Sequence, residues 1–376
     1  MDSDIILVIV VVTALAFDFT NGFHDTANAV ATSISTRALA PKTAVTLSAI
    51  LNFVGAFISI KVAATVAGGI VDSDLITTTV IFAGLIGAIS WNLVTWYFGL
   101  PSSSSHALIG GVVGAAFAAS GADAILGGGL LEKVIVPALV APIVAFVTAG
   151  MCIVITYRMV GRLRPGSVNR GYRLGQIVSA SLLSLSHGTN DAQKTMGIIT
   201  LALIAHGTLS GPSPDPPTWV IVSAALAIAL GTYTGGWRII RTMGSRIYKM
   251  DPAQGFAAQG GGAAVLLTAS HLGFPLSTTH SITGAVLGAG AAKSLSAVRW
   301  GLAGNIAAAW VLTLPAAAAV GALTYGVSRI FGSGALGPLL ISVSLLMLVA
   351  AMFGKRLRHG PAITGATTAT PAPADT

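Results

Sequence analysis

The sequence predicts an all-α polytopic membrane protein built from two inverted-topology repeats. Of its 376 residues, 54% are hydrophobic and only 9% are charged, with a mean hydropathy of +0.83, whereas soluble domains carry about 25% charged residues. The stretches TNGFHDTANAV and LSHGTNDAQKT share a G-x-x-D pattern that ends at Asp25 and at Asp191. An apolar chain with an internally repeated polar motif is typical of a transporter embedded in a bilayer.

The first repeat, residues 1–157, is expected to contain four apolar segments and one hairpin. The first segment exceeds the roughly 20 residues that cross a bilayer, and its polar centre predicts a helix that unwinds near Asn21 and Gly22. The third segment ends in PSSSSH, where Pro101 stops one helix and the serines can cap the next, which predicts a re-entrant helical hairpin. The segments are 5–35, 43–66, 76–100 and 134–157.

A basic linker, 158–173, separates the repeats with five arginines in a stretch that contains proline and glycine. The second repeat, 174–330, holds the Asp191 motif, which is expected on a second unwound helix. It also holds a second hairpin tip, PLSTTH, in which Pro275 and His280 match Pro101 and His106 of the first tip. The separation of the two histidines nearly equals that of the two motif aspartates, which makes chance similarity a poor explanation. The segments of this repeat are 175–205, 219–236, 256–273 and 300–325.

Two further segments follow the repeats. Residues 331–358 are expected to form an additional transmembrane helix, centred on 336–353. The tail 359–376 is of low complexity and is expected to be disordered.

The distribution of basic residues predicts the orientation. With the N-terminus outside, the cytoplasmic loops hold most of the Lys and Arg residues, which is the positive-inside pattern. The central arginine linker and the C-terminus then lie in the cytoplasm of a multi-pass protein of the cell membrane. Because membrane topology accounts for the net charge of +8, we expect the lipid bilayer and no nucleic acid as a partner. The inside residues are Arg37, Lys42, the linker arginines, Arg238, Arg241, Arg246, Lys249, Lys293, Arg299, Lys355, Arg356 and Arg358.

Each repeat combines a carboxylate motif with a hydroxyl-rich hairpin tip. Hydroxyls and free N–H groups at helix N-termini bind anions, whereas Asp25 and Asp191 can carry protons, bind cations or accept hydrogen bonds from P–OH groups. This combination predicts an ion-coupled oxyanion transporter. The structural alternatives are that the tips only cap helices, that Lys194 snorkels to an interface, and that His106 and His280 brace the hairpins.

The motifs GFHDTANAVATSISTRALAP and SHGTNDAQKTMGII and the paired tips resemble the inorganic phosphate transporter family, PiT, over most of residues 5–330. The resemblance implies secondary active import of inorganic phosphate by cation symport, with no catalytic residue, cofactor or resident metal. The implied coupling-ion residues are His24, Asp25, Asn190 and Asp191. The implied phosphate site consists of Asp25, Asn28, Ser103, Ser104, Ser105, Asp191, Gln193, Lys194, Ser277, Thr278 and Thr279.

Two positions bear on the coupling ion. Sodium-coupled members of the family have asparagine where His24 and Lys194 stand, whereas the bacterial, proton-coupled, low-affinity members resemble this chain. An amide oxygen can ligate sodium and an ammonium group cannot, so we expect the proton, with sodium as the alternative. A divalent metal–phosphate complex as the cargo and a homodimeric assembly are left open.

Two other functions compete with phosphate symport. A permease for sulfate or another tetrahedral oxyanion would use the same fold, but sulfate carries no proton at neutral pH, so carboxylates that act as acceptors favour phosphate. An intramembrane hydrolase would need a compact ligand set such as HExxH, which the sequence lacks. We therefore expect a transporter and not an enzyme.

Overall fold

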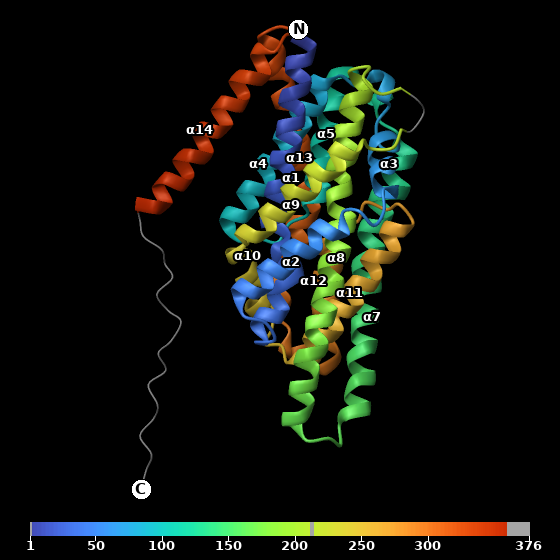
Figure 1. The fold of residues 1–376 in the computed structure, drawn as a ribbon, viewed down its shortest axis with the longest axis vertical. Helices are drawn as coiled ribbons and strands as arrows, with labels where there is room; N and C mark the ends of the chain where they lie inside the picture. The colour runs from blue at the N-terminus through green and yellow to red at the C-terminus, as the bar shows by residue number, and fades with distance from the viewer. Residues whose placement is uncertain (1, 211–213, 359–376) are drawn as a thin grey trace.

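The computed structural model describes residues 2–210 and 214–358, with side chains up to 351, and within these ranges the chain is almost entirely helical (Figure 1). β-structure in the described residues is limited to one isolated bridge between Val71 and Ile125. The α-helices are α1 (Asp2–Ser35), α2 (Pro41–Gly55), α3 (Lys61–Gly68), α4 (Thr78–Phe98), α5 (Ser104–Ser120), α6 (Gly127–Leu130), α7 (Val136–Val160), α8 (Pro165–Ala205), α9 (Thr218–Thr234), α10 (Trp237–Arg241), α11 (Pro252–His271), α12 (Thr278–Lys293), α13 (Trp300–Ile330) and α14 (Leu336–Arg358).

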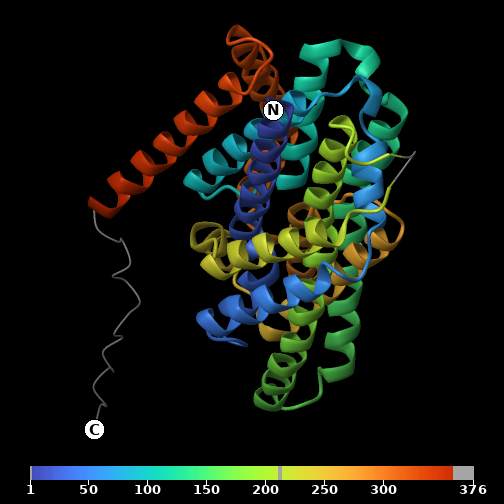
Figure 2. The same cartoon turned by 45° about the horizontal axis from the view of Figure 1, so that its top comes forward.

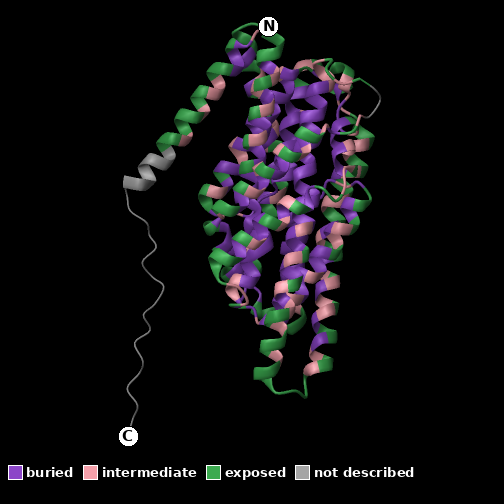
Figure 3. Cartoon of the chain, viewed as in Figure 1, coloured by how far each residue is buried: buried purple, intermediate pink, exposed green. Residues whose placement is uncertain are grey.

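Four helical stretches in the described residues are long and apolar enough to span a membrane: α1, α4, the stretch from α6 through α7, and α13. A fifth candidate consists of α9 and the helical segment Trp237–Arg246, in which a π-helical turn continues α10, and the two parts meet at a bend of 58°. Buried residues fill the centre of this bundle and exposed ones cover its outside (Figure 3). The fold class predicted from composition is therefore confirmed as a polytopic helical architecture.

The predicted unwinding of the motif helix in each repeat is wrong. Both α1 and α8 run without interruption through their polar motifs. The motif glycines serve close packing instead: a Cβ on Gly22 would lie 2.4 Å from the Ile228 carbonyl oxygen of α9, and a Cβ on Gly188 would lie 2.1 Å from the Asn52 carbonyl oxygen of α2. Helix backbones can approach this closely only where a small residue stands.

Two other expected segments also differ from the structure. Residues 43–66 do not form one span, because the helix ends at Gly55 and a new one begins at Lys61. The linker expected at 158–173 is mostly helical, since α7 continues to Val160 and α8 begins at Pro165. In the views of Figures 1 and 2, α2 and α9 cross the long helices obliquely rather than running parallel to them.

Two helical hairpins form where the sequence predicted them. In the first, α4 ends at Gly99 (φ +67°), and Ser103 caps the N-terminus of α5. In the second, Gly273 (φ +79°) follows α11, and Ser277 caps α12. The left-handed conformation suits glycine, which has no Cβ to clash. At each hairpin it turns the chain sharply, so that the next helix begins inside the protein.

Each hairpin helix that begins at a tip packs against a helix from the other half of the chain. The most extensive contacts join α12 to α7 and α5 to α13, and α1 packs on α9 as α2 packs on α8. The last helix, α14, begins beside α13 and extends away from the bundle with mostly exposed residues (Figures 1 and 3). It corresponds to the additional helix expected at 331–358, and the tail 359–376 lies outside the described residues.

Candidate functional site

The polar motifs of α1 and α8 meet the N-termini of α5 and α12 at the centre of the bundle. Asp25 is 2% exposed and Asp191 is 0% exposed, and every other residue of the expected phosphate and coupling sites is also buried. A helix N-terminus leaves backbone N–H groups without intrahelical partners and carries partial positive charge. The two N-termini therefore complement the negative charge of the carboxylates that they face.

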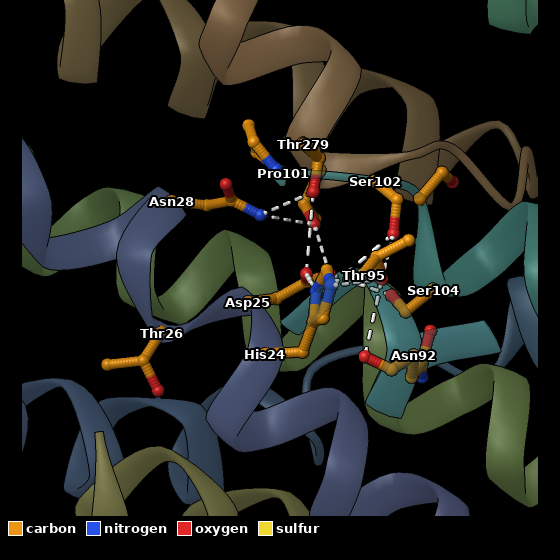
Figure 4. Close-up of polar contacts among 12 residues, drawn as sticks. His24, Asp25, Thr26, Asn28, Asn92, Thr95, Pro101, Ser102, Ser104 and Thr279 are labelled. Atoms are coloured by element: carbon orange, nitrogen blue, oxygen red, sulfur yellow. Dashed lines mark hydrogen bonds and ion pairs between the residues drawn. The ribbon is translucent and has the colours of Figure 1, made fainter. Parts of the chain in front are cut away.

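Asp25 accepts hydrogen bonds from both hairpin tips. Its Oδ2 atom accepts from Ser104 Oγ at 2.7 Å and from Thr278 Oγ1 at 3.2 Å, and its Oδ1 atom accepts from Thr279 Oγ1 at 3.4 Å. Figure 4 shows the carboxylate pointing from α1 towards the tips. A side chain in the middle of one helix thereby holds two helix ends together.

His24 connects Asp25 to a short chain of hydroxyl groups. Its Nδ1 atom lies 2.6 Å from Asp25 Oδ1, while Nε2 lies 3.2 Å from Thr95 Oγ1 and 3.3 Å from Ser102 Oγ. Ser102 also donates to Thr95 at 2.8 Å (Figure 4). Because both ring nitrogens have partners that can donate or accept, the imidazole can pass a proton between Asp25 and this chain.

Asp191 lies between two basic side chains of its own helix. The Lys194 ammonium forms an ion pair with Oδ1, and His187 Nε2 lies 3.0 Å from Oδ2. Lys194 also donates to Ser105 Oγ at 2.5 Å and to the Leu276 carbonyl oxygen at 2.7 Å. The buried ammonium thus has three partners, which is what a charge removed from water requires.

The hydroxyl of Thr278 joins the two carboxylates. Its Oγ1 atom lies 3.2 Å from Asp25 Oδ2 and 3.1 Å from Asp191 Oδ2. A hydroxyl has one hydrogen to donate and two lone pairs to accept with. It can therefore satisfy both oxygens fully only if one of the two carboxyl groups carries a proton and donates it to Thr278.

Asn28 has contacts that correspond to those of Lys194 on the other side of the cluster. Its Nδ2 atom donates to Thr279 Oγ1 at 2.9 Å and to Thr278 Oγ1 at 3.3 Å. Figure 4 shows this amide reaching from α1 to the second tip. Asn28 therefore belongs to the cluster, as the sequence predicted.

Two of the predicted tip residues act as helix caps. Ser103 Oγ accepts from the backbone N–H of His106, and Ser277 Oγ accepts from that of His280. The capping alternative therefore describes Ser103 and Ser277. It does not describe Ser104, which donates to Asp25.

Gln193 and Asn190 are not brought into the cluster. Gln193 Oε1 accepts from the backbone N–H groups of Val62 and Ala63 at the start of α3, at 2.8 and 3.3 Å, and its amide nitrogen donates to a carbonyl of its own helix. Asn190 Nδ2 donates to Ser270 Oγ and to the Phe274 carbonyl oxygen. Both side chains hold neighbouring segments in place instead of contacting the two carboxylates.

The structure adds residues that the sequence analysis did not select. His187 lies four positions before Asp191, on the same face of α8, and that spacing could have identified it. Asp25, His187 and Asp191 each offer a ligand atom within 4.8 Å of the others, a grouping that could hold a metal ion. Thr95 lies within α4, outside the repeated motifs and the hairpin tips.

The two hairpin histidines pack as braces. The rings of His106 and His280 meet edge to face with centroids 4.6 Å apart, and His280 stacks on Trp310 at 4.1 Å. Trp310 in turn donates to the Pro101 carbonyl oxygen at 3.2 Å. These contacts fix α5, α12 and α13 against each other beside the cluster.

The comparisons with known proteins found phosphate transporters. A model of the phosphate transporter family matches residues 21–321. A Mycobacterium tuberculosis (strain ATCC 25618 / H37Rv) protein named "Probable low-affinity inorganic phosphate transporter" is 54% identical over 356 residues, which is 95% of this chain and 85% of that protein. Proteins of the same name from Rhizobium meliloti (strain 1021) and Bacillus subtilis (strain 168) are 53% and 47% identical, and each alignment covers 85% of this chain and 96% of the relative.

A solved structure shares the fold. The chain superposes on "The sodium-dependent phosphate transporter" with a TM-score of 0.77, over 86% of this chain and 99% of that chain. At 24% sequence identity this similarity concerns the fold alone.

Proposed function

The chain belongs to the phosphate transporter family, and we propose that it imports inorganic phosphate together with protons through the cluster formed by α1, α5, α8 and α12. The resemblance seen in the sequence motifs is thereby confirmed at the level of the family. The chain is a multi-pass membrane transporter and not an enzyme, which excludes the intramembrane hydrolase.

The donors around the two carboxylates suit a phosphate anion. Apart from the two capping serines, and from Ser102, which bonds Thr95, each tip carries two hydroxyls. Asn28 and Lys194 add an amide and an ammonium group. In this arrangement the carboxylates accept hydrogen bonds from Ser104, Thr278 and Lys194 that phosphate oxygens would accept instead. Phosphate binding therefore exchanges one set of acceptors for another, and charge-assisted hydrogen bonds of this kind are the strong ones. These four tip hydroxyls belong to Ser104, Ser105, Thr278 and Thr279.

The observation that carries the proposal for the coupling ion is the position of Lys194. Its ammonium is 1% exposed and bonds Asp191, Ser105 and the Leu276 carbonyl. A cation bound beside Asp191 would meet this fixed positive charge at close range and be repelled. A proton on a nearby carboxyl removes negative charge without needing an oxygen cage, so it meets no such barrier.

The shared hydroxyl of Thr278 supports the same conclusion. Two carboxylates that both lie against one hydroxyl repel each other, and such pairs favour binding a single proton between them. With that proton present, the cluster has less negative charge to oppose an incoming phosphate. Proton binding to the Asp25–Asp191 pair and phosphate binding are then mutually favourable, which is the requirement for symport.

The arrangement of the helices supports two inverted repeats at 1–157 and 174–330. The elements recur in the same order in the two halves. Each contact between a helix of the first half and one of the second has a counterpart with the roles of the halves reversed: α5 packs on α13 as α12 packs on α7, and α1 packs on α9 as α8 packs on α2. The N-terminus and the turn between α7 and α8 lie at opposite ends of the bundle in Figure 1. This fits an outside N-terminus and a cytoplasmic turn that carries the arginines.

A second candidate differs only in the cargo. The grouping of Asp25, His187 and Asp191 offers two carboxylates and an imidazole, ligands that divalent metals accept. A divalent metal–phosphate complex would place its metal on these groups and its phosphate on the tips. Chelation of divalent ions during uptake separates this cargo from free phosphate.

The function is tested by radiolabelled phosphate uptake into proteoliposomes with proton and sodium gradients imposed separately. We expect uptake that an inward proton gradient stimulates, that a protonophore abolishes, and that needs neither sodium nor divalent metal. Unlabelled arsenate should compete and sulfate should not. Uptake that needs sodium and ignores the protonophore contradicts proton coupling, and effective competition by sulfate indicates a broader oxyanion permease.

A further inference from the structure

One carboxyl group in the bundle lies outside the phosphate cluster and lacks any partner for its charge. Asp18 is on α1 and is 0% exposed. Neither of its carboxylate oxygens has a hydrogen-bond partner among the described residues. An ionised carboxylate that is buried without compensation is strongly unfavourable, so such a group takes up a proton or a cation.

The neighbours of Asp18 suit a change of protonation. The side chains of Asn21 and Thr195 lie next to the carboxylate, and Asn21 Oδ1, Asn21 Nδ2 and Thr195 Oγ1 are buried and without hydrogen-bond partners themselves. An amide and a hydroxyl can each donate and accept. They can therefore serve a carboxylate as donors and a protonated carboxyl group as acceptors, with a rotation of the side chains between the two.

The charged groups that act on Asp18 leave it uncompensated. Asp191 and Lys194, both on α8, act on it with opposite signs, and because they form an ion pair with each other they add little net charge beside Asp18. The helices α4 and α9 also pack against α1. Tyr97 and Tyr233 are their only titratable residues, and both tyrosines are exposed.

Asp18 stands on α1 before the phosphate cluster. It precedes Asp25 by seven residues, which is about two helical turns or ~10 Å along the axis and nearly the same helix face. Asp18 therefore lies between the N-terminal end of α1 and the cluster. We propose that Asp18 is a second proton-binding site of the transport cycle, distinct from the Asp25–Asp191 pair and formed with Asn21 and Thr195.

In the cycle, the Asp18 carboxylate binds one proton from the solution at the N-terminal side of α1. An O–H bond forms at one carboxylate oxygen, no other bond changes, and the same bond breaks when the proton leaves to the opposite solution. The neutral form lowers the negative charge beside Asp191 while phosphate is bound. This inference rests on the proposed proton symport and extends it to the number of protons that accompany each phosphate.

The test compares the parent with Asp18→Asn, whose amide has nearly the shape of the protonated carboxyl group and cannot release a proton. Proteoliposomes receive an inward gradient of about one pH unit with the membrane potential held at zero, and the steady-state ratio of internal to external phosphate is measured. One proton fewer per phosphate lowers this ratio about tenfold per pH unit. Asp74→Asn, at an exposed position, serves as the matched control.

The expected result is an accumulation ratio about tenfold lower for Asp18→Asn, with phosphate–phosphate exchange at equal pH retained, and a parental ratio for Asp18→Glu and Asp74→Asn. An unchanged ratio in Asp18→Asn overturns the inference and leaves proton symport standing. Loss of exchange in Asp18→Asn, or a lowered ratio in Asp18→Glu, also overturns it, because Asp18 would then serve the fold or phosphate binding. A parent that does not respond to the proton gradient refutes the proposed function itself.

Discussion

The Lys194 ammonium donates a hydrogen bond to the Ser105 hydroxyl at 2.5 Å and thereby ties α8 to the N-terminus of α5. The corresponding contact on the other side joins Asn28 to Thr279 at 2.9 Å and ties α1 to α12. Each polar motif thus holds the hairpin tip of the other half of the chain. The two contacts differ in one respect: one is made by a neutral amide and the other by a fixed positive charge.

Replacing Lys194 by asparagine removes that charge and makes the two contacts chemically alike. We expect Lys194→Asn to lose proton-driven uptake or to gain dependence on sodium, because an amide oxygen can ligate sodium where an ammonium repels it. Phosphate uptake is measured with and without sodium. Lys42→Asn, at an exposed position, should behave as the parent. Sodium-free uptake at the parental rate by Lys194→Asn would show that the ammonium does not select the ion.

The paired carboxylates are expected to be indispensable for net transport. Asp25→Asn and Asp191→Asn each remove a group that accepts the Thr278 hydroxyl and can take up a proton. Net phosphate uptake should fall to the level of empty liposomes while the protein remains in the membrane, as judged by its amount in the membrane fraction. The exposed Asp123→Asn is the control. A parental rate in either variant would make that aspartate structural.

The tip hydroxyls are expected to divide into ligands and caps. A hydrogen bond to a charged group is worth roughly 1.5–3 kcal/mol, so Ser104→Ala and Thr278→Ala should weaken apparent phosphate affinity about 10- to 100-fold. Ser103→Ala removes the cap of α5 and should lower thermal stability instead, by about 0.5–2 kcal/mol. Concentration dependence of uptake and thermal unfolding distinguish the two effects. Unchanged affinity in both Ser104→Ala and Thr278→Ala would place phosphate elsewhere.

The motif glycine of α8 is expected to tolerate no side chain. A Cβ at Gly188 would lie 2.1 Å from the Asn52 carbonyl oxygen, a backbone atom that cannot move aside without shifting α2. Gly188→Ala should therefore destabilise the protein by at least about 1–3 kcal/mol, seen as a lower midpoint of thermal unfolding. Gly171→Ala lies on the same helix with open space around its Cβ and should leave the midpoint unchanged or raise it. Equal midpoints for the two variants would argue against close packing of α2 on α8.

Much of the architecture could be predicted from the sequence because the polar motifs and the hairpin tips interrupt an otherwise apolar chain. The tips at Ser104 and Thr278 and the motif residues Asp25, Asn28 and Lys194 were selected by type and position, and the structure brings them together. The polar motif and the hairpin tip each occur twice in the chain. A repetition of this kind can be recognised in a single sequence, without knowledge of the structure.

Other features depended on tertiary contacts that no local pattern encodes. Gly22 was interpreted as a point of unwinding, but it lets α1 approach α9 closely. The residues of α9 that it faces are far away in the sequence. Gln193 stands in the polar motif and yet turns towards α3, because the start of that helix offers N–H groups without intrahelical partners. Asp18 could have been noticed, since an aspartate at membrane depth two turns before Asp25 is itself unusual.

The most direct test of proton symport is the movement of the proton itself. Proteoliposomes with a pH-sensitive dye trapped inside are diluted into sodium-free buffer, and phosphate is added outside. We predict an internal acidification that depends on phosphate, is abolished in Asp25→Asn, and does not change when sodium is supplied. Phosphate uptake without acidification, or acidification that appears only when sodium is present, would contradict the account.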